Sequence, residues 1–121
     1  MKFSLLLFIL SIKLKQAAKK NINFKKFIRD KRLNFAIKTA DGKRGRVYSF
    51  SNGQISTRSG LSQKAESAMV WSDADTAFKI MASGNEEASV AALTERKLQA
   101  EGDLKEFMWF SRALDIMMGK T

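Results

Sequence analysis

Two short turn signals divide the middle of the chain into three segments in which apolar and polar residues alternate. The turns are Asp41-Gly42 and Asn52-Gly53, residue pairs that adopt the positive φ angles of tight hairpins at low cost. Alternation with a period of two is typical of a strand that buries one face. The pattern therefore predicts an antiparallel meander with strands at residues 33–38, 46–50 and 54–58.

The remainder of the chain predicts two more strands and three helices. A strand is expected at residues 65–71 and another at 96–101, each followed by residues that favour a helix start. The three helices are expected to begin at Ser72, at Asn85 and at Asp103. In the first helix, Asp75 would complete a capping box with Ser72, and Gly84 would end the helix.

The composition argues against catalysis. The chain has 121 residues, which suits one domain, and it contains no His and no Cys. It therefore offers no imidazole base, no thiolate and none of the usual ligand sets for zinc, haem or iron–sulfur clusters. Asp73, Asp75 and Asp103 are explained by helix capping and the helix dipole. Carboxylate, Ser or Lys chemistry stays formally open, but we expect no enzyme, no catalytic residue, no metal and no cofactor.

Positive charge is concentrated near the N-terminus. Residues 1–32 carry ten Lys or Arg and one acidic residue, whereas residues 33–121 carry twelve basic and eleven acidic residues. A net charge of +10 therefore belongs mostly to the first part of the chain. We expect two parts, a basic amphipathic N-terminal segment at 1–31 and a folded domain at 32–119.

The N-terminal segment begins with an apolar run at residues 3–12, about half the length that a membrane-spanning helix needs. A secretory signal peptide is the rival interpretation, but no Ala-x-Ala-like site follows the run and several Lys residues do. We favour a retained helix over residues 3–20 that lies on an anionic membrane surface, at the cytoplasmic side of the inner membrane. The alternative is that the run packs on the domain. The candidate membrane-binding residues are Phe3, Leu6, Phe8, Ile9, Lys13, Lys15, Lys19 and Lys20.

The last predicted helix carries more apolar surface than one contact with a small sheet would use. Trp109 and Ile116 lie outside its main apolar arc. A second helix, a partner chain, a membrane or a bound lipid must therefore cover the remainder. The main arc consists of Leu104, Phe107, Phe110, Leu114, Met117 and Met118.

Three stretches in this order resemble the sterol carrier protein 2 family of lipid-binding domains, over about residues 33–118. The first is the meander from Asp41-Gly42 to Arg58-Ser59-Gly60. The second runs from Met69-Val70-Trp71-Ser72-Asp73-Ala74-Asp75 to Gly84, and the third is Arg96-Lys97-Leu98-Gln99-Ala100-Glu101-Gly102-Asp103. One departure is Arg96, which stands where the family often has Gly.

The resemblance implies an α+β fold in which a mostly antiparallel sheet of about five strands is backed by helices around an apolar cavity. Here an extra N-terminal helix would be added. A fatty acyl, sterol-like, polyprenyl or quinone-type ligand would occupy the cavity, and six Met residues suit an adaptable pocket. The candidate lipid-binding residues are Phe78, Met81, Val90, Leu93, Leu104, Phe107, Phe110, Leu114, Met117 and Met118.

Three functions from different classes remain open at this point. The leading hypothesis is a non-enzymatic lipid carrier that docks on a membrane through its basic N-terminus. The second is a nucleic-acid-binding module that uses the basic segment on phosphates. It is disfavoured because the aromatic residues interleaved with the positive charge are limited to Phe24 and Phe27. The strands also carry no recognisable RNA-recognition aromatic motif. The third is a homodimeric interaction module that uses the last helix.

Overall fold

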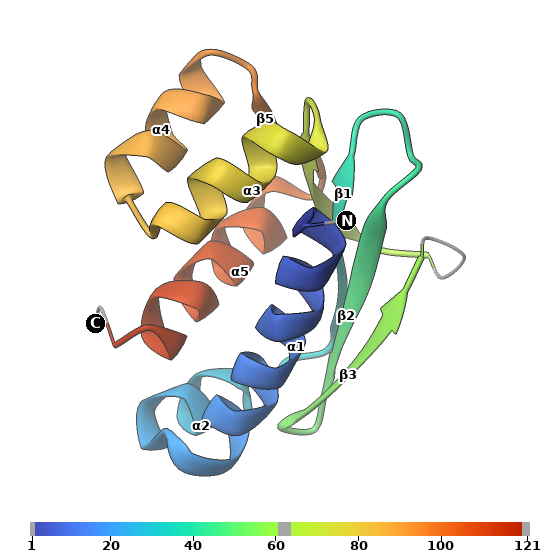
Figure 1. Ribbon diagram of the computed structural model, residues 1–121. Coiled ribbons are helices and arrows are strands. Elements are labelled where there is room, and N and C mark those ends of the chain that lie inside the picture. Colours follow the sequence, from blue (N-terminus) through green and yellow to red (C-terminus); the bar gives the residue numbers. More distant parts are fainter. Residues whose placement is uncertain (1, 61–63, 120–121) are drawn as a thin grey trace.

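A five-stranded sheet forms one layer of the molecule, and helices lie on one side of it (Figure 1). The computed structural model describes residues 2–60 and 64–119. The strand order is β3-β2-β1-β4-β5, in which β1 and β4 are parallel and the other neighbours are antiparallel. The α+β class is thereby confirmed. The strands are β1 (Leu33–Thr39), β2 (Gly45–Ser51), β3 (Gln54–Ser59), β4 (Ser67–Trp71) and β5 (Leu98–Gly102).

The predicted meander is confirmed in β1, β2 and β3. Asn52 and Gly53 connect β2 to β3 with φ angles of 53° and 77°, as a two-residue turn with positive φ at both central positions requires. The register places Phe35 opposite Tyr48 and Leu33 opposite Phe50. These side chains are buried and face the helices, so the alternating pattern does mark the core side of the sheet.

The helix layer follows the predicted order, and all predicted helices are present. Two helices precede the sheet in the chain, of which the second, Ile22–Ile28, was not predicted, and three follow β4 or β5. The helices are α1 (Lys2–Lys20), α2 (Ile22–Ile28), α3 (Ala74–Ser83), α4 (Glu86–Thr94) and α5 (Leu104–Met117).

Helix α1 packs on the sheet and contributes to the core. Phe3 and Leu7 are each 1% exposed, and Leu14 is fully buried. They belong to the same hydrophobic cluster as Phe35 of β1 and Phe110 of α5. The two parts expected from the charge distribution, 1–31 and 32–119, therefore share one core in the described chain.

Polar contacts beneath α1 fix its position on the sheet. The Tyr48 hydroxyl donates a hydrogen bond of 2.8 Å to the carbonyl of Leu7, and Arg46 Nε donates one of 2.8 Å to Ser11 Oγ. Burial raises the pKa of Tyr48 far above its ordinary value, so this phenol remains a neutral donor. Arg46 also lies over the ring of Phe8, with its guanidinium carbon 5.5 Å from the ring centroid.

Helix α2 covers the flank of α5 that carries Trp109 and Ile116. Phe27 stacks on Trp109 with ring centroids 5.1 Å apart, and Asn21 Nδ2 donates a hydrogen bond to the carbonyl of Ile116. The ammonium group of Lys31 lies 5.0 Å from the Trp109 ring centroid. A second helix was one of the four candidates expected to cover the extra apolar surface of α5, and α2 does so on this flank. Part of the main arc of α5 faces a cavity described below.

The helix starts agree with the sequence except at one residue. Asn85 caps α4, Asp103 caps α5, and Gly84 ends α3 with a φ of 63°. The N-cap of α3 is Asp73 and not Ser72, which corrects the prediction by one position. The reason is that the backbone N–H of Ser72 donates to the carbonyl of Lys97, so Ser72 still continues the β4–β5 pairing.

Candidate functional site

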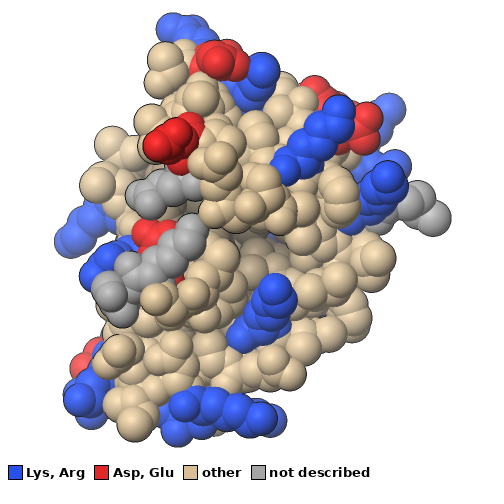
Figure 2. All heavy atoms as spheres, turned by 60° about the vertical axis from the view of Figure 1, so that its left-hand side comes forward, with Lys and Arg blue, Asp and Glu red and all other residues tan. Residues whose placement is uncertain are grey.

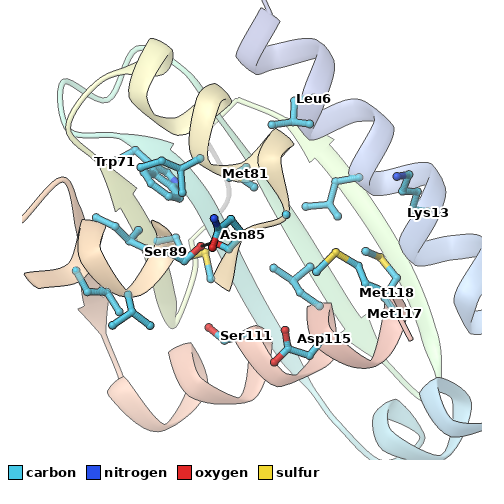
Figure 3. Close-up of a pocket in the computed structure, with 18 of the residues that line it drawn as sticks. Leu6, Lys13, Trp71, Met81, Asn85, Ser89, Ser111, Asp115, Met117 and Met118 are labelled. Carbon is cyan, nitrogen blue, oxygen red and sulfur yellow. Dashed lines mark hydrogen bonds between the residues drawn. The ribbon is translucent and has the colours of Figure 1, made fainter. Parts of the chain in front are cut away.

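A cavity of about 320 Å³ lies between the sheet and helices α1, α3, α4 and α5 (Figure 3). Its volume is at the lower end of the range of small-molecule sites, which is about 300–1,000 Å³. Its base consists of inward side chains of β4 and β5, namely Met69, Trp71 and Leu98. The wall from α5 is formed by Phe107, Ser111, Leu114, Asp115 and Met117.

Helix α1 provides one wall of this cavity. Leu6, Ile9, Leu10 and Lys13 line it, at spacings of three and four residues that put them on one side of a helix. The opposite wall comes from α3, α4 and the turn between them. Its residues are Ile80, Met81, Gly84, Asn85, Ser89, Val90 and Leu93.

The mouth of the cavity is apolar and exposed. Ile9, Val90, Leu93 and Met118 line the cavity, and their exposed fractions are 40%, 57%, 42% and 48%. They come from α1, from α4 and from the residue after α5. Figure 2 shows this side of the molecule as a largely uncharged surface with a hollow in it and with Lys and Arg side chains around it. The apolar side chains at the mouth therefore give an apolar molecule a route into the cavity between the charged groups.

Polar side chains in the lining are few, and most have bonding partners. Asn85 Oδ1 accepts hydrogen bonds from the backbone of Glu87 and Ala88, and Ser111 Oγ donates to the carbonyl of Phe107. Lys13 and Asp115 take part in no ion pair with other residues of the described chain. The described residues contain no group of three or more His, Cys, Asp or Glu side chains that could hold a metal ion. The arrangement suits the burial of an apolar ligand.

The structure brings most of the predicted lipid-binding residues together. Phe110 is fully buried and stacks on Phe35, so it belongs to the core and not to the cavity wall. Phe78 and Leu104 do not line the cavity either; Phe78 is half-buried beside Lys2, and Leu104 is exposed. The residues that do line it are Met81, Val90, Leu93, Phe107, Leu114, Met117 and Met118.

The predicted membrane-binding residues divide between the inward and outward sides of α1. Phe3 lies in the core, one helical turn before Leu7. Leu6 is half-buried in the cavity wall, and Ile9 is in the wall and at the surface. Within residues 2–60 and 64–119, no helix combines the length and apolar character that crossing a bilayer requires. The exposed members of the set are Phe8, Ile9, Lys13, Lys15, Lys19 and Lys20.

Sequence reasoning missed the walls that come from α1 and from the sheet. The spacing of Leu6, Leu10 and Lys13 was a usable signal for one face of α1, although neighbouring apolar residues hid it. Met69, Trp71 and Leu98 were recognised only as strand residues. Their place at the base of a cavity depends on pairing between β4 and β5, which no local pattern reveals.

Comparison with known proteins identifies the fold through structure and not through sequence. Neither a protein-family model nor a curated protein sequence matches the chain. The structure of a UbiJ-SCP2 ubiquinone synthesis protein is similar with a TM-score of 0.70 and 14% identity, over 93% of this chain and 96% of that one.

Two other solved structures are similar at lower scores. One is a conserved hypothetical protein from Thermus thermophilus described as possibly a sterol carrier protein, with a TM-score of 0.56 and 15% identity, over 89% of this chain and 78% of that one. The other is a stereoselective inverting sec-alkylsulfatase from Pseudomonas sp., with a TM-score of 0.51 and 15% identity, over 72% of this chain but 14% of the sulfatase. The arrangement of strands, helices and cavity, together with these likenesses, shows that the chain has the fold of a sterol carrier protein 2 domain.

Proposed function

We propose that this protein is a non-enzymatic lipid carrier that holds one apolar ligand in the cavity beneath α1. The observation that supports this most directly is a cavity with largely apolar walls and an exposed apolar mouth, in a sterol carrier protein 2-like fold. Removing hydrocarbon surface from water stabilises the bound state by about 25 cal/mol per Å², so the carrier needs no chemistry to retain its ligand. The likeness to a ubiquinone synthesis protein favours a polyprenyl or quinone-type ligand over a sterol.

We further propose that the mouth of the cavity docks on an anionic membrane surface. The outer side of α1 presents Leu5, Phe8, Ile9 and Ile12 as exposed apolar residues in its first turns. Exposed Lys residues follow on the same helix and continue into α2, where they would attract acidic lipids by about 1 kcal/mol each. Ile9 belongs both to this surface and to the mouth, so a docked protein would exchange its ligand directly with the bilayer.

Ligand binding is tested first by organic extraction and mass spectrometry of protein purified under mild conditions. We expect an apolar molecule at a stoichiometry near one per chain. Displacement of a fluorescent fatty acid and of a fluorescent polyprenyl analogue then measures binding to the emptied protein. An empty extract, combined with no binding of either probe at micromolar concentration, would contradict the carrier function.

A matched pair of variants on α4 ties binding to the cavity. Ser89 is half-buried in the cavity wall, whereas Ala91 lies exposed on the same helix and outside the lining. Ser89→Phe should fill the cavity and reduce probe binding at least tenfold, and Ala91→Phe should leave binding unchanged. Equal binding by both variants would place the ligand elsewhere.

A further inference from the structure

Trp71 lines the cavity and carries an unused, buried hydrogen-bond donor. This residue ends β4, and its side chain is 2% exposed. Its backbone carbonyl accepts a bond of 2.8 Å from Ala40, but its indole Nε1–H meets no acceptor in the described part of the chain. Most buried polar groups in proteins are paired, and an orphaned buried donor costs free energy comparable to a lost hydrogen bond.

The polar side chains of the cavity do not supply the missing acceptor. Asn85 Oδ1 already accepts two backbone N–H groups. The hydroxyls of Ser89 and Ser111 donate to backbone carbonyls and keep free lone pairs, as does the carboxylate of Asp115, but none of these oxygens lies within hydrogen-bond distance of the indole nitrogen. The other inward residues of the cavity base, Met69 and Leu98, offer a thioether and hydrocarbon. The acceptor is therefore best provided from outside the chain.

The charges in the lining restrict what that acceptor can be. Lys13 is the basic residue that lines the cavity, and Figure 3 shows it and Trp71 at opposite ends of the drawn pocket. A carboxylate or phosphate placed against Trp71 would be buried without a counter-charge, which is costly. A neutral carbonyl or ester oxygen can accept a hydrogen bond from the indole N–H without the cost of burying an unpaired charge.

We propose that the ligand of this cavity carries a neutral acceptor oxygen of the ketone, quinone or ester class, which accepts a hydrogen bond from Trp71 Nε1. The inference rests on the proposed lipid-carrier function and specifies the ligand and its orientation. The oxygen enters first, and the hydrocarbon chain extends toward Met118 and Lys13 at the other end. The indole nitrogen is buried in this structure, so a lining side chain must move before the ligand oxygen can reach it. Met81 lines the same cavity and has the flexible side chain that suits such a movement.

The donor can be observed directly by nuclear magnetic resonance of the full chain. The protein has two Trp residues, so a ¹H–¹⁵N spectrum contains two indole signals, and Trp109→Phe assigns them. The probes are a long-chain methyl ketone and the n-alkane of the same chain length. We expect both to bind, and we expect the Trp71 indole proton to shift downfield with the ketone only. Equal shifts with ketone and alkane would overturn the inference while leaving the carrier function intact.

Affinity measurements provide an independent test of the same bond. Trp71→Phe keeps an aromatic ring but removes the donor, so it should weaken ketone binding roughly three- to tenfold and leave alkane binding nearly unchanged. Trp109→Phe, whose ring stacks on Phe27 away from the cavity lining, should change neither. If Trp71→Phe lowers both affinities equally, Trp71 contributes packing alone and the inference fails.

A fatty acid of the same chain length tests the neutrality of the acceptor. Its carboxylate should avoid the Trp71 end, so the Trp71 indole signal should shift as it does with the alkane. A downfield shift as large as that produced by the ketone would overturn the restriction to neutral oxygens. If neither ketone nor alkane binds, the carrier function fails and this inference fails with it.

Discussion

Gly102 occupies a backbone position that no other residue fits. Its φ is 79°, and a Cβ atom added there would lie 2.3 Å from the carbonyl oxygen of Glu66, the residue just before the neighbouring strand β4. The Gly-Asp pair at the start of α5 therefore has a physical explanation: Gly102 allows the close approach, and Asp103 caps the helix.

We predict that Gly102→Ala lowers the free energy of unfolding by about 3 kcal/mol or more, because it combines positive φ with a backbone clash. Gly42→Ala is the matched control, since Gly42 has a φ of 73° and nothing within 4 Å of an added Cβ. The control should lose only about 1–2 kcal/mol in urea unfolding. Equal losses would show that the approach to Glu66 relaxes without cost.

Arg96 adopts the left-handed conformation that Gly usually provides at the end of a helix. Its φ is 62°, and the bonds from Arg96 N to Leu93 O and from Lys97 N to Ala92 O form a Schellman motif after α4. This finding explains the one departure from the family pattern, because the turn keeps its shape although Gly is absent.

Substitutions at Arg96 should therefore change stability in opposite directions. Arg96→Gly relieves the positive φ and should raise the free energy of unfolding by up to about 1 kcal/mol, after subtraction of the greater freedom of Gly in the unfolded chain. Arg96→Val, which is β-branched, should lower it. Thermal unfolding of the two variants measures both changes, and a melting temperature that falls in Arg96→Gly would contradict the explanation.

At the scale of single residues, the sequence predicted the caps well but not their exact place at α3. Ser, Asp and Asn all serve as N-caps, so Ser72 and Asp73 are equally good candidates locally. The choice depends on the bond from Ser72 to Lys97 on a distant strand. Once Asp73 is the cap, hydrogen bonds from Thr76 lower the pKa of its carboxyl group, because they favour the charged form.

At the scale of elements, α1 has two faces that the sequence did not separate. Its buried face follows a helical period through Phe3, Leu7, Leu10 and Leu14, but apolar residues also occupy the outer face of the first turns. The whole run therefore read as one apolar block, and its packing on the sheet remained one of two alternatives. Apolar residues spaced three and four apart reveal the buried face of a helix only where the positions between them are polar.

Leu7 and Leu5 provide a matched test of these two faces. Leu7 is 1% exposed in the core, and Leu5 is 59% exposed on the same helix. We predict that Leu7→Ala lowers the free energy of unfolding by about 2–5 kcal/mol, whereas Leu5→Ala changes it by less than about 0.5 kcal/mol. Similar losses in urea unfolding would mean that α1 does not pack as described.

At the scale of the whole molecule, the sequence anticipated one side of the cavity. Apolar residues in α5 exceeded what packing needs and were named as candidates, and several of them, such as Leu114, line the cavity. The wall from α1 and the base at Trp71 could not be anticipated, because they depend on contacts between elements far apart in the chain. The fold itself was accessible because its turns and caps carry local signals.

Removal of residues 1–31 would not isolate a docking segment, since it would strip Phe3, Leu7 and Leu14 from the core and a wall from the cavity. Surface variants are therefore the appropriate test of membrane docking. Phe8 and Ile12 are exposed on α1 and lie outside the cavity lining, so they can be changed without removing a ligand contact. Met108, which is exposed on α5 and also outside the lining, serves as the control.

We predict that the protein co-sediments with anionic liposomes and that appreciable binding survives at about 0.5 M salt, where the screening length is only a few ångströms. Part of the binding free energy would come from insertion of apolar side chains such as Phe8 and Ile12, which salt does not screen. The double variant Phe8→Ser/Ile12→Ser should therefore lose the salt-resistant part, while Met108→Ser should keep it.

Binding to nucleic acid through phosphate contacts behaves differently. The logarithm of its affinity falls with the logarithm of the salt concentration, in proportion to the number of phosphate contacts. Tight, salt-sensitive binding to RNA or DNA without liposome binding would reverse the assignment and make the basic residues of α1 and α2 a nucleic-acid surface.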